Sequence, residues 1–268
     1  MSKPRLTVLA LASVLFAVSS PAQPWATSVI SYSAGTGGAA GYDNPDNALG
    51  EPSRTTQAFP SGTDPVTPFN PAWPASQLVS IGAGGSLTLQ FGQTVHNAAG
   101  NPFGIDFIIF GNNGFTITNG NFSGGGITDG TTFTFDSPGA SRVLVSADNV
   151  SYFELVAPPG ITATVDGLFP TDGSGDFQRP VNPTLTGADF AGKNLDGIRA
   201  LYAGSAGGTG FDLSWGPLSD INYLRVEVSS GKLEIDGIAV VPEPGTWALL
   251  GLSAFLSVAA YRRRWFSK

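Results

Sequence analysis

Short runs of alternating hydrophobic and polar residues fill the chain between residues 25 and 240. In Ser86–Phe91 (SLTLQF) every second residue is Leu or Phe, and Thr131–Phe135 and Tyr223–Val228 show the same period. This alternation predicts β-strands with one buried and one exposed face. The run Asp106–Phe110 (DFIIF) is continuously apolar after its aspartate, which predicts a central strand covered on both faces.

Four further apolar stretches predict additional strands: Arg142–Ser146, Ser151–Val156, Gly197–Tyr202 and Leu233–Val240. Gly, Pro, Asn and Asp separate them, as expected for turns. No stretch of twelve residues in this region repeats its apolar positions with the 3.6-residue period of a helix. We therefore expect an all-β fold in which residues 23–241 form one antiparallel β-sandwich.

Composition supports a folded chain with many turns. The 268 residues include 36 Gly and 20 Pro, and 41% of the residues are hydrophobic, which suffices for a packed core. The sequence contains no Cys and one His. Disulfide frameworks, cysteine nucleophiles and multi-histidine zinc sites are therefore excluded.

The region between residues 23 and 241 is strongly acidic, with 19 acidic and 7 basic residues and a net charge of −12. Such a surface repels phosphate backbones, so we expect no nucleic-acid partner. It favours divalent cations, because 15 of the 20 acidic residues in the chain are Asp, whose oxygens suit calcium.

Residues 1–22 have the pattern of a signal peptide. Lys3 and Arg5 precede the apolar run Leu6–Val18, and small residues ending at Ala22 offer a cleavage site. The run is short for a membrane span, which disfavours the alternative of an uncleaved anchor. The pattern predicts export.

Residues 242–268 combine a proline motif, a short apolar stretch at 246–260 and a basic end. The apolar stretch predicts a short transmembrane helix, and the basic end places that side of the membrane in the cytoplasm. An ordinary tail anchor is the simpler interpretation. The motif residues are Pro242, Glu243 and Pro244, followed by the cluster Arg262, Arg263 and Arg264.

In this order, these three features resemble the PEP-CTERM sorting signal of exported bacterial proteins. The resemblance implies that an exosortase recognises and removes the tail. It also implies a transient stay in the inner membrane, followed by delivery to the cell surface or to extracellular polysaccharide.

The region before the tail also resembles known surface proteins. Segments such as Asp106–Asn112 (DFIIFGN) resemble a family of exported bacterial surface proteins in which position 111 is usually Glu rather than Gly. Leu233–Val240 (LEIDGIAV) resembles the last strand of galactose-binding-like jelly rolls. That resemblance implies a structural calcium held by Asp236 together with an early loop.

The position of Asp236 in the alternation leaves two alternatives open. Ile238 and Val240 share its parity, whereas Leu233 and Ile235 do not. Either Gly237 forms a bulge that resets the face, or Asp236 points inward with a partner. For calcium, Asp43 and Asp46 in the early loop would join Asp236, although Asp and Asn are also ordinary turn residues. Asp172–Asp176 (DGSGD) lacks the glutamate of an EF-hand and predicts a solvated turn.

Candidate sugar-binding residues are the aromatic side chains Trp73, Trp215 and Tyr202, each of which has a core position as its alternative. No catalytic constellation is visible: His96 has no nucleophile elbow, and no pair of carboxylates stands out. We expect a non-catalytic surface or matrix protein, with calcium-supported glycan binding as its most specific form. The alternatives are a polysaccharide hydrolase or lyase and a purely structural matrix component.

Overall fold

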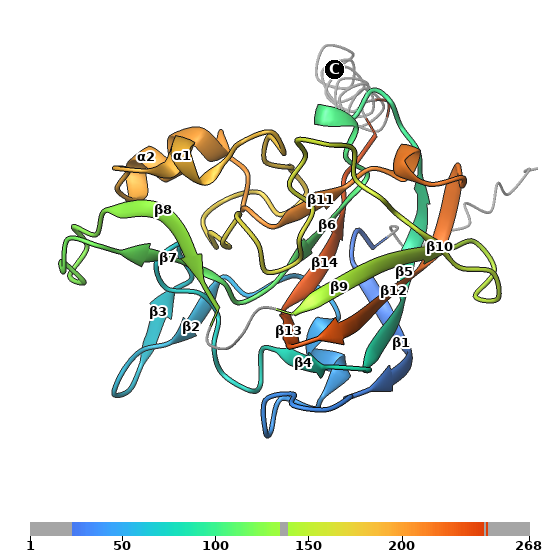
Figure 1. The fold of residues 1–268 in the computed structure, drawn as a ribbon, viewed down its shortest axis with the longest axis horizontal. Coiled ribbons are helices and arrows are strands. Elements are labelled where there is room, and N and C mark those ends of the chain that lie inside the picture. Colours follow the sequence, from blue (N-terminus) through green and yellow to red (C-terminus); the bar gives the residue numbers. More distant parts are fainter. Residues whose placement is uncertain (1–22, 135–138, 244, 246–268) are drawn as a thin grey trace, which may run out of the picture.

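The computed structural model describes residues 23–134, 139–243 and 245 (Figure 1). The predicted signal peptide, the predicted transmembrane helix at 246–260, Pro244, the arginine cluster and Phe135 lie outside these residues. Within the described part of the chain, no helix is long and apolar enough to cross a membrane. Every pairing between its named strands is antiparallel, which confirms the predicted all-β class.

One layer is a five-stranded antiparallel sheet in the order β1-β5-β12-β9-β10. Its longest strands, β5 and β12, lie next to each other at its centre. The strands are β1 (Ala26–Ser33), β5 (Ser86–His96), β12 (Asp220–Ser230), β9 (Ala140–Ser146) and β10 (Phe153–Glu154).

The second layer consists of a three-stranded sheet, β11-β6-β14, and a two-stranded sheet, β13-β4. Two hairpins, β2-β3 and β7-β8, and two short helices lie at the left of Figure 1. The bounds are β2 (Thr55–Gln57), β3 (Thr63–Pro65), β4 (Val79–Gly82), β6 (Phe107–Phe110), β7 (Gly114–Ile117), β8 (Thr128–Phe133), α1 (Gly187–Phe190), α2 (Leu195–Tyr202), β11 (Thr209–Phe211), β13 (Lys232–Ile235) and β14 (Gly237–Val240).

The two layers share one hydrophobic core, so the predicted sandwich is present. Leu87 and Leu224 from the five-stranded sheet belong to the same buried cluster as Ile81, Ile109 and Ile238 from the second layer. Each such fully buried side chain stabilises the fold by about 1.5–3 kcal/mol. The alternating runs therefore mark the face that each strand turns to this core.

Strand β6 is buried on both faces, as its continuous apolar run predicts. Ile109 faces the sandwich core, whereas Ile108 and Phe110 contact a second buried cluster that includes Phe177. The sandwich core covers one face of β6 and the Phe177 cluster covers the other, while β11 and β14 pair with its two edges. On its other side, β14 is bridged by Trp25.

Three strand predictions need correction. Gly197–Tyr202 is part of helix α2, in which Ile198 and Tyr202 are buried one turn apart. In Ser151–Val156 only two residues pair as β10. Leu233–Val240 is not one strand, because Asp236 separates β13, which pairs with β4, from β14, which pairs with β6.

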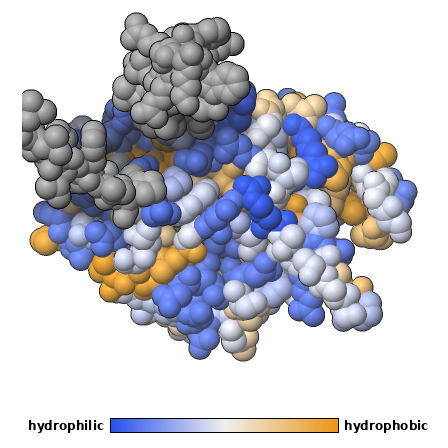
Figure 2. Space-filling view, turned by 180° about the vertical axis from the view of Figure 1, so that it is seen from behind, coloured by the Kyte–Doolittle hydropathy of each residue, from blue (hydrophilic) through white to orange (hydrophobic). Residues whose placement is uncertain are grey.

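Figure 2 shows the molecule from behind, with a mostly hydrophilic surface and hydrophobic residues gathered at its lower left and right. Among the described residues, several large apolar side chains are exposed in loops. Phe59 is 94% exposed and Phe122 is 77% exposed. Both stand in Gly- and Pro-containing or Gly-rich loops, so their exposure does not result from the strand pattern.

Candidate functional site

A pocket of about 530 Å³ lies beside the β2-β3 hairpin and strand β13. It combines three aromatic side chains with five that carry amides or carboxylates. The lining residues are Ala39, Tyr42, Gln57, Phe59, Asp64, Asn70, Trp73, Asn112 and Glu234. Segments far apart in the sequence meet here because β13 brings the end of the chain beside β4.

Trp73 is held in the pocket wall by three hydrogen bonds. Its indole Nε1 donates to the carbonyl oxygen of Gln57 at 3.0 Å. Its backbone N–H donates to Thr56 Oγ1 at 3.3 Å, and its carbonyl accepts from the hydroxyl of Tyr42 at 2.6 Å. The indole is therefore fixed before any ligand arrives. Of the three predicted sugar-binding aromatics, Trp73 is the one in this pocket.

Glu234 is a buried carboxylate that contributes to the same pocket, with only 5% of the residue exposed. Its carboxylate accepts a hydrogen bond from Asn112 Nδ2, and Lys232 Nζ lies 3.6 Å from its Oε1. Burial raises the pKa of Glu234 above its usual value, and the Lys232 charge opposes this shift. Glu234 follows the alternation of β13, in which Leu233 and Ile235 face the core.

A second buried carboxylate, Asp166, supports the pocket residues through the backbone. Its Oδ1 accepts from the N–H of Asn112 and its Oδ2 from the N–H of Glu234, both at 2.9 Å. Burial raises the pKa of Asp166 to about 7, against the effect of these donors. A Cβ at position 111 would overlap Asp166 Oδ1, so Gly111 leaves the room that this carboxylate occupies.

Asp236 points inward, which decides between the two alternatives left open by the sequence. Its Oδ2 accepts from the Ser53 N–H at 2.7 Å and its Oδ1 from Ser53 Oγ at 2.8 Å. Burial raises its pKa to about 7. Both carboxylate oxygens are thus occupied by one serine at the point where the chain passes between sheets.

The structure does not gather the three predicted calcium ligands into one group. Asp43 and Asp46 are exposed in and before a short 3₁₀ turn at Pro45–Ala48, whereas Asp236 is buried against Ser53. In the described ranges, no group of three or more acidic or histidine side chains could hold a metal ion. The early loop forms an internal hydrogen bond, in which the Asn44 side chain accepts from the Asp46 N–H at 3.3 Å.

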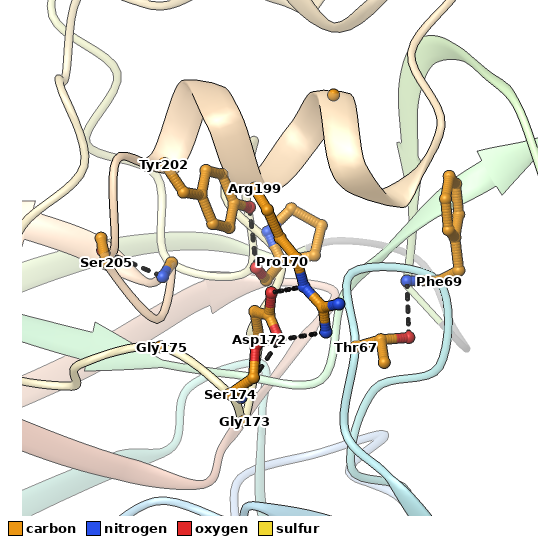
Figure 3. Close-up of polar contacts among 12 residues, drawn as sticks. Thr67, Phe69, Pro170, Asp172, Gly173, Ser174, Gly175, Arg199, Tyr202 and Ser205 are labelled. Atoms are coloured by element: carbon orange, nitrogen blue, oxygen red, sulfur yellow. Dashed lines mark hydrogen bonds and ion pairs between the residues drawn. The ribbon is translucent and has the colours of Figure 1, made fainter.

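The other two predicted aromatic residues lie elsewhere. Tyr202 is 2% exposed and its hydroxyl donates to the Pro170 carbonyl at 2.7 Å, so it is a core residue rather than a ligand-binding one (Figure 3). Trp215 lines a different pocket of about 610 Å³, and its ring packs against Phe211. The structure therefore does not bring the three aromatics together.

The Asp172 turn is tied to helix α2 by an ion pair. Arg199 reaches from α2 and donates to Asp172 through Nε at 2.6 Å and Nη2 at 3.0 Å (Figure 3). Ser174 donates to the same carboxylate through its N–H and its hydroxyl. Burial alone would raise the pKa of Asp172, but the donors hold it below its usual value. The predicted turn is present, and its first aspartate is buried rather than solvated.

Tyr42, Phe59 and Glu234 were not singled out by the sequence. The alternation of β13 placed Glu234 on the face opposite Leu233 and Ile235, which is the only sequence signal for its role. Phe59, in the loop sequence AFPSG, had no strand pattern to bury it.

Residues 240–264 match the PEP-CTERM protein-sorting motif. The match contains Pro242, Glu243 and Pro244 together with the arginine cluster, so the predicted sorting segment is confirmed. The motif indicates an exported protein that transits the membrane, is processed by an exosortase, a membrane protease, and reaches the cell surface. No curated protein matches the chain.

Proposed function

We propose that the exported domain is a non-catalytic glycan-binding module of the cell surface or extracellular matrix, with the Trp73 pocket as its glycan site. One observation carries the proposal: three aromatic side chains and five amide or carboxylate side chains line the same pocket. In this proposal the sandwich is of the galactose-binding-like jelly-roll type, a likeness carried by the sequence of Leu233–Val240.

The chemistry of the lining suits a sugar ring. Pyranose C–H groups pack against aromatic rings, while ring hydroxyls need hydrogen-bond partners at the edges. Phe59, Tyr42 and Trp73 supply the aromatic surface, and Asn70 and Asp64 supply polar groups beside it. A volume of about 530 Å³ is of the size found for small-molecule sites, roughly 300–1,000 Å³.

A polysaccharide hydrolase or lyase is the second candidate, favoured by Glu234. This pocket carboxyl is buried and its pKa is raised, as for a general acid. Asp64 lines the same pocket and would have to act as its partner. Release of new reducing or unsaturated ends from a bound polysaccharide, lost in Glu234→Gln, would support the enzyme instead of the binding module.

The binding proposal is tested by a matched pair of phenylalanine variants in the purified full chain. Phe59→Ala removes an exposed aromatic ring from the pocket, and Phe122→Ala removes one from a loop outside it. Loss of a ring contact worth about 1.4 kcal/mol weakens binding roughly tenfold. We expect this loss on an oligosaccharide array for Phe59→Ala only.

Equal binding by both variants would show that the pocket is not the glycan site. Absence of binding by the unaltered chain to every oligosaccharide would overturn the glycan-binding function itself. Because both side chains are exposed, neither substitution removes a core contact, and equal unfolding midpoints for the two variants would verify this.

A further inference from the structure

Both aromatic N–H and O–H donors of the pocket are used internally. The single N–H of the Trp73 indole is given to Gln57, and the single O–H of Tyr42 is given to Trp73. Asn112 directs an amide N–H to Glu234, and Asn70 directs one to the Pro65 carbonyl at 3.2 Å. Each of these two amides retains one hydrogen and the Gln57 amide carries two more, while ionised carboxylates have none to give.

The same lining is rich in acceptors and carries negative charge. Glu234 and Asp64 are acceptor-only groups when ionised, and no Lys or Arg is among the lining residues. Lys232 offsets the charge of Glu234 from outside the lining, but Asp64 has no ion-pair partner among the described residues. The two carboxylates therefore favour a ligand that brings hydrogen-bond donors, and a positive charge would be stabilised beside them.

We propose that this pocket selects glycan residues that carry a free, protonated amino group over their N-acetylated or carboxylated counterparts. The inference rests on the proposed glycan-binding function and specifies its ligand class. An ammonium group brings three donors and one positive charge, which complement the acceptors of Glu234 and Asp64.

The same two carboxylates disfavour N-acetylated sugars and uronic acids. N-acetylation removes the charge and leaves one N–H donor, while adding a carbonyl acceptor to a pocket that already has an excess of acceptors. A uronic acid would place a carboxylate beside Asp64 and Glu234, and like charges repel. The net charge of −12 between residues 23 and 241 further attracts a cationic polymer and repels an anionic one.

The test compares three oligosaccharides of equal length in calorimetric titrations of the full chain. They are the fully deacetylated β-1,4-glucosamine hexamer, the N-acetylated hexamer and a hexagalacturonate. We expect the deacetylated hexamer to bind at least tenfold more tightly than the N-acetylated one, and hexagalacturonate to bind most weakly. We also expect the preference to shrink as salt increases, because exposed charges are screened.

Two pocket variants and one control locate the preference. Asp64→Asn and Glu234→Gln should each weaken binding of the deacetylated hexamer at least threefold and leave the N-acetylated hexamer unchanged. Glu154→Gln removes a carboxylate from β10, outside the pocket, and should change neither. Asp64 is exposed on β3, so its variant remains informative even if Glu234→Gln unfolds.

Several outcomes would overturn the inference. Equal or tighter binding of the N-acetylated hexamer would refute amino selection and leave glycan binding intact. Absence of binding by all three oligosaccharides, in a chain that binds other glycans on an array, would also refute it; absence on the array as well would refute the proposed function. If hexalysine displaced a bound oligosaccharide as effectively as the deacetylated hexamer does, the pocket would bind ammonium groups of peptides and the inference would be wrong.

Discussion

Asp166 and Asp236 carry carboxyl groups into the interior, and no cationic side chain is paired with either among the described residues. Burial raises the pKa of each to about 7. Because the folded-state pKa lies above the unfolded value of 3.8, proton binding favours the folded state. This stabilisation is complete at low pH and is lost as the pH rises through about 7.

Asp236→Asn should flatten this pH dependence. The amide can accept from the Ser53 N–H and donate to Ser53 Oγ, so the local geometry is kept without a titrating group. Between pH 5 and pH 8, we expect the free energy of unfolding of the unaltered chain to fall by about 2–3 kcal/mol more than that of the variant. Urea unfolding at a series of pH values measures the difference.

The remaining slope in Asp236→Asn would report the other buried carboxyl groups whose pKa is raised by burial, which are Asp166, Glu234 and Asp106. Parallel curves for the variant and the unaltered chain would mean that Asp236 has an ordinary pKa in the folded state, contrary to its burial.

At the level of single residues, the sequence showed which positions break the alternation pattern, but it did not show which residues form hydrogen bonds with them. The parity of Asp236 against Ile238 and Val240 showed that its position was unusual. Its partner, Ser53, lies 183 residues earlier and is set by the meeting of the layers. Trp73 and Tyr202 were candidates by residue type alone, and the burial of Tyr202 depends on a helix that had not been predicted.

Among the elements, helix α2 depends on its surroundings for stability. Eight residues are too few for a stable helix in water, so packing and ion pairing must hold it. Ile198 and Tyr202 pack into a buried cluster, and Arg199 pairs with Asp172 on another segment. This pair joins the helix to the Asp172 turn shown in Figure 3.

Arg199→Met should destabilise the chain by about 2 kcal/mol or more, because it leaves the Asp172 carboxylate buried without its cation. Lys193→Met is the matched control, since Lys193 is an exposed cation in the loop before the same helix. Urea unfolding of both variants measures the difference. An equal effect of the two would contradict a specific role for the ion pair, and Asp172→Asn added to Arg199→Met should recover part of the loss.

The failure to predict α2 has a simple cause. In Gly197–Tyr202 (GIRALY), Ile198, Ala200 and Tyr202 alternate as in a strand, but Ile198 and Tyr202 also lie one helical turn apart. A run of only six residues is compatible with both the two-residue period of a strand and the 3.6-residue period of a helix. The helix start is fixed by Asn194, whose side chain accepts from the Gly197 N–H at 3.0 Å. Ser86–Phe91 is equally short, and its strand prediction is confirmed because it forms the first half of β5.

For the whole molecule, the alternation of hydrophobic residues predicts the sandwich. It does not predict which segments cover the outer face of the second layer. Phe177 and Ala206 come from irregular segments and bury the outer face of β6 and β14. Such segments have no period from which their position could be predicted. The position of the pocket could not be predicted for the same reason, because most of its lining residues come from irregular segments.

Removing residues 246–268 should leave the folded domain intact, because Val241 is the last of the described residues that is both buried and hydrogen-bonded to the sandwich. This residue is buried, and its N–H donates to the Asp106 carbonyl at 2.9 Å. We expect the truncated chain to keep its circular dichroism spectrum and its thermal midpoint. Truncation before Leu233 would remove most of β13 and all of β14 and should abolish the cooperative transition. Loss of the fold in the shorter deletion would contradict the role of the tail as a sorting segment alone.

The pairing of β14 also determines how the domain would bear tension. A pull on the chain at Val241 acts along β14, which has β6 on one side and the Trp25 segment on the other. In antiparallel pairs the hydrogen bonds run across the strands, so this force shears several rungs at once instead of opening them one by one. The carbonyl of Pro24 adds a further rung to Val240 at 2.7 Å. A domain pulled from its C-terminal strand would therefore resist mechanical unfolding.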